Sequence, residues 1–188
     1  MKNQFNPEYK PSINLDFIYK EINIDGNIIQ LQIWDIDGSK RFNFLGESFY
    51  RNSECCALVF DLNDKKSFEN IENWRTEFLN HLNLKDPETF PFILIGNKND
   101  KVSERKVEEY IVKQYCESKS NMRYFETSCK DDINVEAAFE EMEKIAFIRA
   151  SNGENDFIKY EQLFKEQKLL MKKAKIILNK KLMKFINY

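Results

Sequence analysis

A short apolar run that ends in a polar cluster constrains this chain more than any other feature. Residues 90–96 read Phe-Pro-Phe-Ile-Leu-Ile-Gly, and Asn97-Lys98-Asn99-Asp100 follow directly. A continuous apolar run of this length is typical of a strand buried on both faces in a parallel sheet. Open sheets of this class bind ligands just beyond the carboxyl ends of their strands, which is where the polar cluster would lie.

The polar cluster has the chemistry to read a purine base. The carboxylate of Asp100 can accept two hydrogen bonds, from the N1–H and 2-amino groups of guanine, which adenine does not offer. The stem of Lys98 can lie along the ring face. A polar turn after a core strand fits this stretch equally well, so the rest of the chain must decide between the two interpretations.

Strands and helices are predicted to alternate along the chain. Expected strands cover residues 12–24, 28–35, 55–62, 90–96 and 122–127, and expected helices cover 67–82, 103–118 and a segment capped by Asn134. Asp25-Gly26 between the first two strands predicts a β-hairpin. The alternation elsewhere predicts an α/β fold, in which a mainly parallel sheet is flanked by helices.

The second expected strand has a clear two-residue period. Ile29, Leu31 and Ile33 alternate with two glutamines and Trp34. Because successive side chains in a strand point to opposite faces, the aliphatic trio is expected to face the core and Trp34 the other side.

Composition is consistent with one ordinary domain. The chain has 188 residues, of which 42% are hydrophobic, and its net charge of −2 gives no reason to expect a nucleic-acid partner. The four cysteines, Cys55, Cys56, Cys116 and Cys129, lack a metal-type spacing and are interpreted as reduced thiols of a cytoplasmic protein. No apolar run approaches the roughly 20 residues that span a bilayer.

The C-terminal region has a different character and sets an expected boundary between residues 1–150 and 151–188. From Glu154 onward the sequence holds nine lysines and four acidic residues, and its apolar residues recur at helical spacing. This pattern predicts a basic amphipathic helical extension. Two roles remain open for it: lying on an anionic membrane surface, or packing on a protein partner.

Three motifs follow expected strands in a fixed order. They are Trp34-Asp35-Ile36-Asp37-Gly38, Gly96-Asn97-Lys98-Asn99-Asp100 and Glu126-Thr127-Ser128-Cys129-Lys130. Over residues 5 to about 149 the chain resembles the Ras-like small GTPases, within them the Rab branch, and most closely the late-endosomal Rabs. Further matching segments are Leu31-Gln32-Ile33, Arg41-Phe42, Leu45-Gly46, Phe49-Tyr50-Arg51, Phe90-Pro91-Phe92 and Tyr124-Phe125.

The resemblance implies a binding site for GTP or GDP with Mg²⁺. It assigns the base pocket to Asn97, Lys98, Asp100, Ser128, Cys129 and Lys130. It matches Ser12 and Asp35 to the magnesium region and Gly38 to the amide that faces the terminal phosphate. It also matches Phe17, Trp34 and Phe49 to the aromatic triad through which Rabs meet effector proteins.

The chain departs from the family at the phosphate end. No Gly-x-x-x-x-Gly-Lys-Ser/Thr segment occurs in it, and in the family that P-loop, the strand before it and the helix after it precede the position of Met1. The fold expected is therefore a Ras-like P-loop NTPase sheet that lacks its first strand, P-loop and first helix. The strands ending at Asp35 and Asp61 must then pair directly or leave open edges, which predicts a marginally stable monomer or a dimer.

The segment Asp37-Gly38-Ser39-Lys40, which matches the family's second switch, also departs from the family pattern. Asp37 replaces an Ala, Ser39 replaces the water-orienting Gln and Lys40 replaces a Glu. A carboxylate about 4 Å from a phosphate oxygen costs about 4 kcal/mol at an effective dielectric near 20. Ser39 is too short to align water, so little or no hydrolysis is expected. The C-terminal residues contain no cysteine for prenylation.

Two main functions remain open. One is a pseudo-GTPase of vesicle traffic that acts through effector-type partners and is peripheral on endosomal membranes. The other is a GTP-hydrolysing Rab whose sequence is truncated at the N-terminus, which requires an upstream Gly-x-x-x-x-Gly-Lys segment in the same reading frame. A membrane-surface or partner-binding module built on the C-terminal helix is a third.

Overall fold

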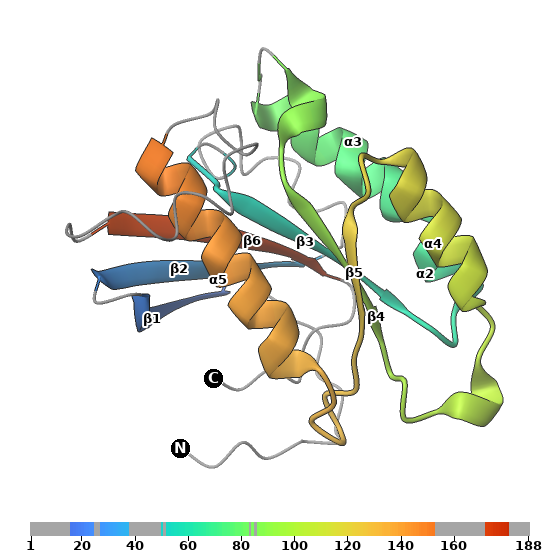
Figure 1. Ribbon diagram of the computed structural model, residues 1–188. Coiled ribbons are helices and arrows are strands. Elements are labelled where there is room, and N and C mark those ends of the chain that lie inside the picture. The colour runs from blue at the N-terminus through green and yellow to red at the C-terminus, as the bar shows by residue number, and fades with distance from the viewer. Residues whose placement is uncertain are drawn as a thin grey trace.

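The computed structural model describes residues 16–24, 27–37, 50, 52–82, 84, 86–152 and 172–180. A six-stranded sheet has the order β1-β2-β6-β3-β4-β5. Helix α5 lies on one face of it, and α2, α3 and α4 lie on the other (Figure 1). The α/β class and the mainly parallel sheet are as predicted. The strands are β1 (Asp16–Ile24), β2 (Asn27–Asp37), β3 (Cys55–Asp61), β4 (Phe92–Asn97), β5 (Arg123–Glu126) and β6 (Lys172–Lys180).

The predicted hairpin is confirmed. β1 and β2 pair antiparallel from Asp16 opposite Asp35 to Ile24 opposite Asn27, and the Asp-Gly pair itself lies outside the described residues. Ile29, Leu31 and Ile33 are at most 4% exposed, as their period predicted. Trp34 lies on the opposite face, half-buried.

Two expected helices begin or divide differently from the prediction. The segment 67–82 lies in two helices, α2 (Lys65–Glu69) and α3 (Ile71–Leu82), and the side chain of Asp64 caps the first. The helix expected from 103 begins later, as α4 (Glu109–Ser118). The amides of Lys106 and Val107 both donate to the Leu62 carbonyl. These bonds hold residues 106–107 against the end of β3, so these two residues are not part of a helix.

The C-terminal helical extension was a wrong prediction for residues 172–180, which form β6. This strand runs parallel to β2 over nine paired residues and parallel to β3 over four. The expectation that β2 and β3 pair directly or leave open edges was also wrong, because β6 lies between them. The physical reason is that two strand edges with unpaired amides and carbonyls outweigh the helical pattern of a lysine-rich segment.

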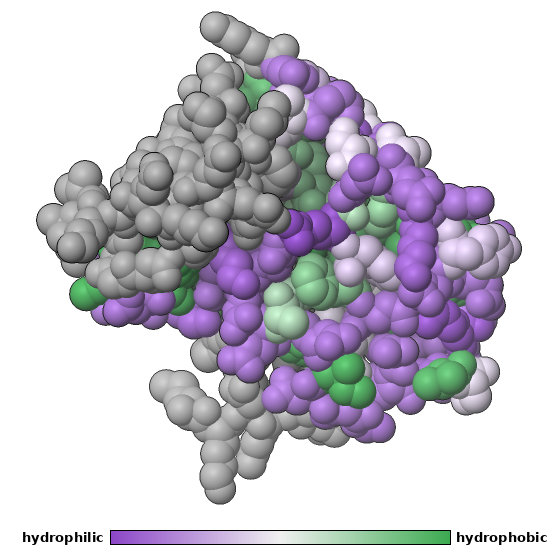
Figure 2. All heavy atoms as spheres, viewed as in Figure 1, coloured by the Kyte–Doolittle hydropathy of each residue, from purple (hydrophilic) through white to green (hydrophobic). Residues whose placement is uncertain are grey.

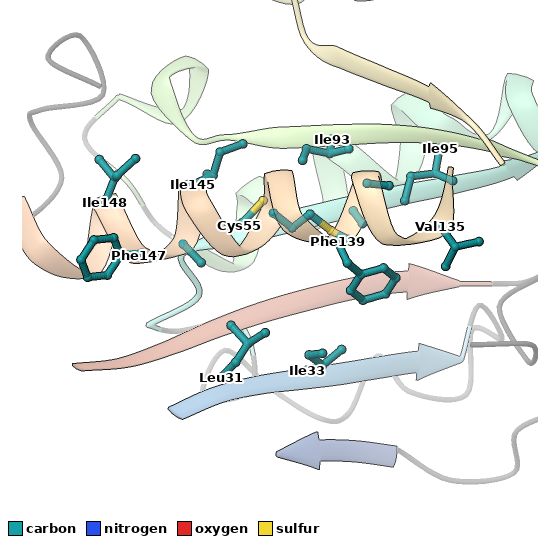
Figure 3. Packing of buried hydrophobic residues seen from close by; sticks show 14 of the residues in the cluster. Leu31, Ile33, Cys55, Ile93, Ile95, Val135, Phe139, Ile145, Phe147 and Ile148 are labelled. Atoms are coloured by element: carbon teal, nitrogen blue, oxygen red, sulfur yellow. The ribbon is translucent and has the colours of Figure 1, made fainter. Parts of the chain in front are cut away.

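Hydrophobic clusters fill both sides of the sheet. On one side, α5 (Val135–Asn152) packs Phe139, Met142 and Ile145 over β2, β3 and β4. Figure 3 shows Leu31 and Ile33 pointing from β2 toward this helix. On the other side, Phe60 of β3 and Phe78 of α3 belong to a second cluster that α4 also joins.

The described part of the face in Figure 2 is mostly hydrophilic, with smaller hydrophobic areas between the hydrophilic residues. None of the helices described combines the length and apolar character needed to cross a bilayer.

The position of β6 makes the cost of a proline depend on where it is placed. Ile177→Pro removes an amide from a residue that has partners on both β2 and β3, and it should lower the free energy of unfolding by about 1–3 kcal/mol, the cost of an unsatisfied buried partner. Lys172→Pro, at the first residue of the strand, is the control and should change stability less. Urea unfolding followed by circular dichroism measures both. Equal effects of the two prolines would contradict the central position of β6.

Candidate nucleotide-binding site

Two loops meet at the carboxyl ends of β4 and β5. The Thr127 amide donates to the Gly96 carbonyl at 2.8 Å, and the Asn99 amide donates to the Thr127 carbonyl at 3.0 Å. These bonds join the loop that follows β4 to the loop that follows β5. The parallel pairing of the two strands thus continues into the region where a ligand is expected.

Asn97 braces this junction. It is 2% exposed, and its Oδ1 accepts hydrogen bonds from the Thr127 hydroxyl at 3.2 Å and from the Cys129 amide at 3.4 Å. The Cys129 thiol lies 3.5 Å from the same oxygen. The side chain of Asn97 therefore fixes the backbone that is expected to close over a base.

The carboxylate of Asp100 is held in one orientation. The Ser128 hydroxyl donates to Asp100 Oδ1 at 2.7 Å, and the Asp131 amide donates to the Ser128 hydroxyl at 3.1 Å. Lys130 Nζ lies 4.0 Å from Asp100 Oδ2. Because a carboxylate has about four lone-pair sites, Asp100 retains capacity to accept from a ligand. The residues predicted for the base pocket are therefore brought together.

Lys98 has a partner that the sequence interpretation missed. Its Nζ lies 2.8 Å from Asp61 Oδ2, and Asp61 Oδ1 accepts from the Asn63 amide at 2.8 Å. Lys98 has a φ of 67°, in the left-handed region, where a non-glycine residue carries strain of order 1 kcal/mol. Asp61 ends β3, the strand next to β4, and this position in the sequence could have predicted the ion pair.

A second feature that the sequence analysis missed is the ion pair between Arg105 and Glu126, the last residue of β5. It is called the Arg105–Glu126 brace below. Arg105 donates through two guanidinium nitrogens to both carboxylate oxygens of Glu126, one at 2.9 Å. The Tyr124 hydroxyl donates to Glu126 Oε1 at 2.7 Å. Hydrogen bonds from Arg105 hold the pKa of Glu126 below its ordinary value. No motif spacing in the sequence indicated this pair.

The magnesium and phosphate region is only partly described. Asp35 lies near the carboxyl end of β2, paired with Asp16. Ser12, Gly38 and Ser39 lie outside the described residues, as does Phe49 of the expected aromatic triad. Within the part of the chain that the structure describes, no group of three metal-type side chains is present. The residues predicted for the base pocket are thus neighbours, while their role in reading a base and the magnesium region both stay predictions.

Comparison with known proteins identifies the family. The profile described as "Ras family" matches residues 1–147. This chain belongs to the Ras family. It is 46% identical over 143 residues to Ras-related protein Rab-7a of Paramecium octaurelia, covering 76% of this chain and 69% of that protein. It is 50% identical over 146 residues to Ras-related protein RABG3d of Arabidopsis thaliana, covering 77% and 71%.

A third relative has the same pattern. Ras-related protein Rab7 of Glycine max is 50% identical over 138 residues, which covers 72% of this chain and 67% of that protein. The Ras-family chain is thus a Rab-type member, similar to Rab7 proteins, as the residue pattern predicted. Members of this family generally bind GTP and GDP with Mg²⁺.

The Arg105–Glu126 brace should appear in the acid dependence of stability. The pKa of folded Glu126 lies below its ordinary value of 4.5, so the brace stabilises the fold fully above that pH. This contribution is lost as the pH falls through the folded pKa. Glu126→Gln should therefore lower stability at pH 7 and flatten its decline below pH ~4.5. Glu109→Gln, which removes an exposed carboxylate on α4, is the control. Parallel pH profiles of the Glu126→Gln variant and the unaltered chain, from urea unfolding, would contradict the assignment.

Proposed function

We propose that this chain is a Rab-like protein of vesicle traffic that keeps the base-reading half of the family's site, lacks efficient hydrolysis, and acts through partner proteins. The observation that carries this proposal is the contrast between two parts of the site. The Asn97, Asp100 and Ser128 network is complete. The second switch, in contrast, carries Asp37 and Ser39 where the family has Ala and Gln.

The altered switch residues oppose catalysis by two separate physical effects. Asp37 stands where the family has a neutral Ala, and its negative charge would repel the terminal phosphate of a nucleotide unless a cation lay between them. Ser39 cannot reach as far as a Gln to orient an attacking water. Catalysis of phosphoryl transfer depends almost entirely on positioning and electrostatic stabilisation, so losing both leaves little rate enhancement.

A second candidate, a GTP-binding and GTP-hydrolysing Rab, is favoured by a specific observation. The loops after β4 and β5 are joined by backbone hydrogen bonds, and Lys98 already pairs with Asp61. A pocket organised before the ligand arrives loses less free energy on binding. Nucleotide affinity therefore separates the two candidates.

Calorimetric titration with GDP and GTP in the presence of Mg²⁺ tests the proposal. We expect affinity weaker than micromolar, and no GTP turnover above background. Any guanine binding that is measured should be reduced at least tenfold by Asp100→Asn, because the amide replaces one of the two acceptors for guanine. Lys101→Ala, on a neighbouring exposed residue, is the matched control. Micromolar or tighter binding together with turnover would support the second candidate instead.

Partner binding is proposed to use the aromatic residues of β1 and β2. Phe17 is 49% exposed on β1, at the edge of the sheet, and stacks on Trp34 with ring centroids 5.0 Å apart. Tyr19 meets Phe17 edge-on at 5.2 Å and is also exposed. Exposed aromatic clusters of this kind mark protein-binding surfaces. A peripheral location on endosomal membranes through such partners is part of the proposal.

An effector protein of a Rab7-type relative serves as the probe for this surface. Phe17→Ala is expected to weaken its binding at least tenfold, because an exposed aromatic anchor is removed. Tyr110→Ala, which removes an exposed aromatic ring from α4, should leave binding unchanged. Surface plasmon resonance measures both variants, and circular dichroism verifies their folding. Equal binding by the two variants would place the partner surface elsewhere.

A further inference from the structure

A cavity of about 680 Å³ lies where β4 and β5 begin. Because these strands are parallel, their first residues lie at the opposite edge of the sheet from the loops of the candidate nucleotide site. The volume is within the range of roughly 300–1,000 Å³ that small-molecule sites occupy. The cavity is therefore a candidate site for a ligand other than a nucleotide.

The floor of the cavity is apolar. Its lining includes Phe90, Phe92, Met122 and Ile145, all of which are at most 9% exposed. The rings of Phe90 and Phe92 meet with centroids 5.1 Å apart. Since these side chains border the cavity and are otherwise shielded from solvent, an apolar group that enters it would complete their burial.

The charged residues at the cavity are mostly cations. Those among the described lining residues are three cations and one carboxylate, Arg75, Lys119, Arg123 and Glu88. Lys119 is held by Glu72 of α3, and Arg123 is held by Glu141 of α5, each at 2.8 Å. Neither of these two carboxylates is among the described lining residues, so the surface that faces the cavity suits an anion.

Arg75 is the side chain best suited to bind a carboxylate. Its guanidinium lies over the Phe92 ring, 5.5 Å from the centroid, and its side chain is 6% exposed. Nη2 donates to Glu88 Oε2 at 2.7 Å, and Nη1 lies 3.6 Å from Glu72 Oε1. Within the part of the chain that the structure describes, its Nε has no hydrogen-bond partner. A guanidinium has five donors in a fork that fits both oxygens of one carboxylate, so Arg75 has unused capacity.

Glu88 pairs with Arg75 in a way that a ligand can replace. It lies on the short 3₁₀ helix Pro87–Thr89, and its side chain is 64% exposed. An exposed carboxylate that binds through one oxygen contributes little stability. A ligand that binds Arg75 through both oxygens and also buries an apolar body gains two kinds of contact, and it therefore competes with Glu88.

We propose that this cavity binds a small amphipathic carboxylate of the medium-chain fatty acid class. The ligand carboxylate replaces Glu88 on Arg75, and the apolar chain lies over Phe90, Phe92 and Met122. The other two cations at the cavity add attraction for the negative charge. The site uses none of the residues assigned to the nucleotide, so it is independent of the proposed function.

Titration of the full chain with octanoate tests this proposal, with nuclear magnetic resonance following the backbone amides. The amide signals of residues 88–90 and 119–123 should shift to saturation at millimolar octanoate. Hexanoate should bind roughly tenfold more weakly, because it buries two fewer CH₂ groups. Octan-1-ol, which has the same chain and no charge, should also bind at least tenfold more weakly.

Two substitutions separate ligand binding from a structural role of the same residues. Glu88→Gln removes the competing charge and should tighten octanoate binding at least threefold, whereas Arg75→Met should weaken it at least tenfold. Lys113→Ala, at an exposed position on α4, is the control and should leave binding unchanged. Circular dichroism verifies the folding of each variant. If the buried Arg75 cannot be replaced without unfolding, the exposed Glu88→Gln variant alone decides the outcome.

Three results would overturn the proposal. They are the lack of saturable shifts at millimolar octanoate, binding of octan-1-ol as tight as that of octanoate, and unchanged or weaker binding by the Glu88→Gln variant.

Discussion

The parallel pairing of β6 with both β2 and β3 is the constraint on which the rest of the sheet depends. It joins the β1–β2 hairpin on one side to the β3–β4–β5 unit on the other. Buried residues of β2 and β3 belong to the same cluster under α5. The ion pair between Lys20 of β1 and Glu143 of α5, at 2.9 Å, is a second link across the same region.

The candidate site depends most directly on the β3–β4–β5 unit. Asp61, Asn97 and Glu126 end the three strands at one edge, and each is used by a neighbouring loop. Lys98 bonds Asp61, Thr127 bonds Asn97, and Arg105 bonds Glu126. Parallel pairing of β3, β4 and β5 brings the ends of these strands to one edge of the sheet, where the loops that carry the candidate site residues meet.

Prediction from the sequence was correct where a single local pattern was enough to specify a strand or a hairpin. The Asp-Gly hairpin, the apolar runs of β3 and β4 and the period of Ile29, Leu31 and Ile33 each predicted an element that the structure contains. The residues assigned to the base pocket came from motif order at strand ends and from the family resemblance; the structure places them close together, and their role stays a prediction. The failures involve long-range effects. The helical pattern of 172–180 was overridden by two strand edges far away in sequence, and the partners Asp61 and Arg105 are fixed by tertiary contacts that no local spacing encodes.

Contacts across β6 measured by nuclear magnetic resonance test the account most directly. Parallel pairing requires that Ile176 show inter-strand backbone contacts both to Ile33 of β2 and to Cys55 of β3, its register partners on the two sides. Sequential amide–amide contacts of a helix through residues 172–180, or direct backbone contacts between β2 and β3, would contradict it.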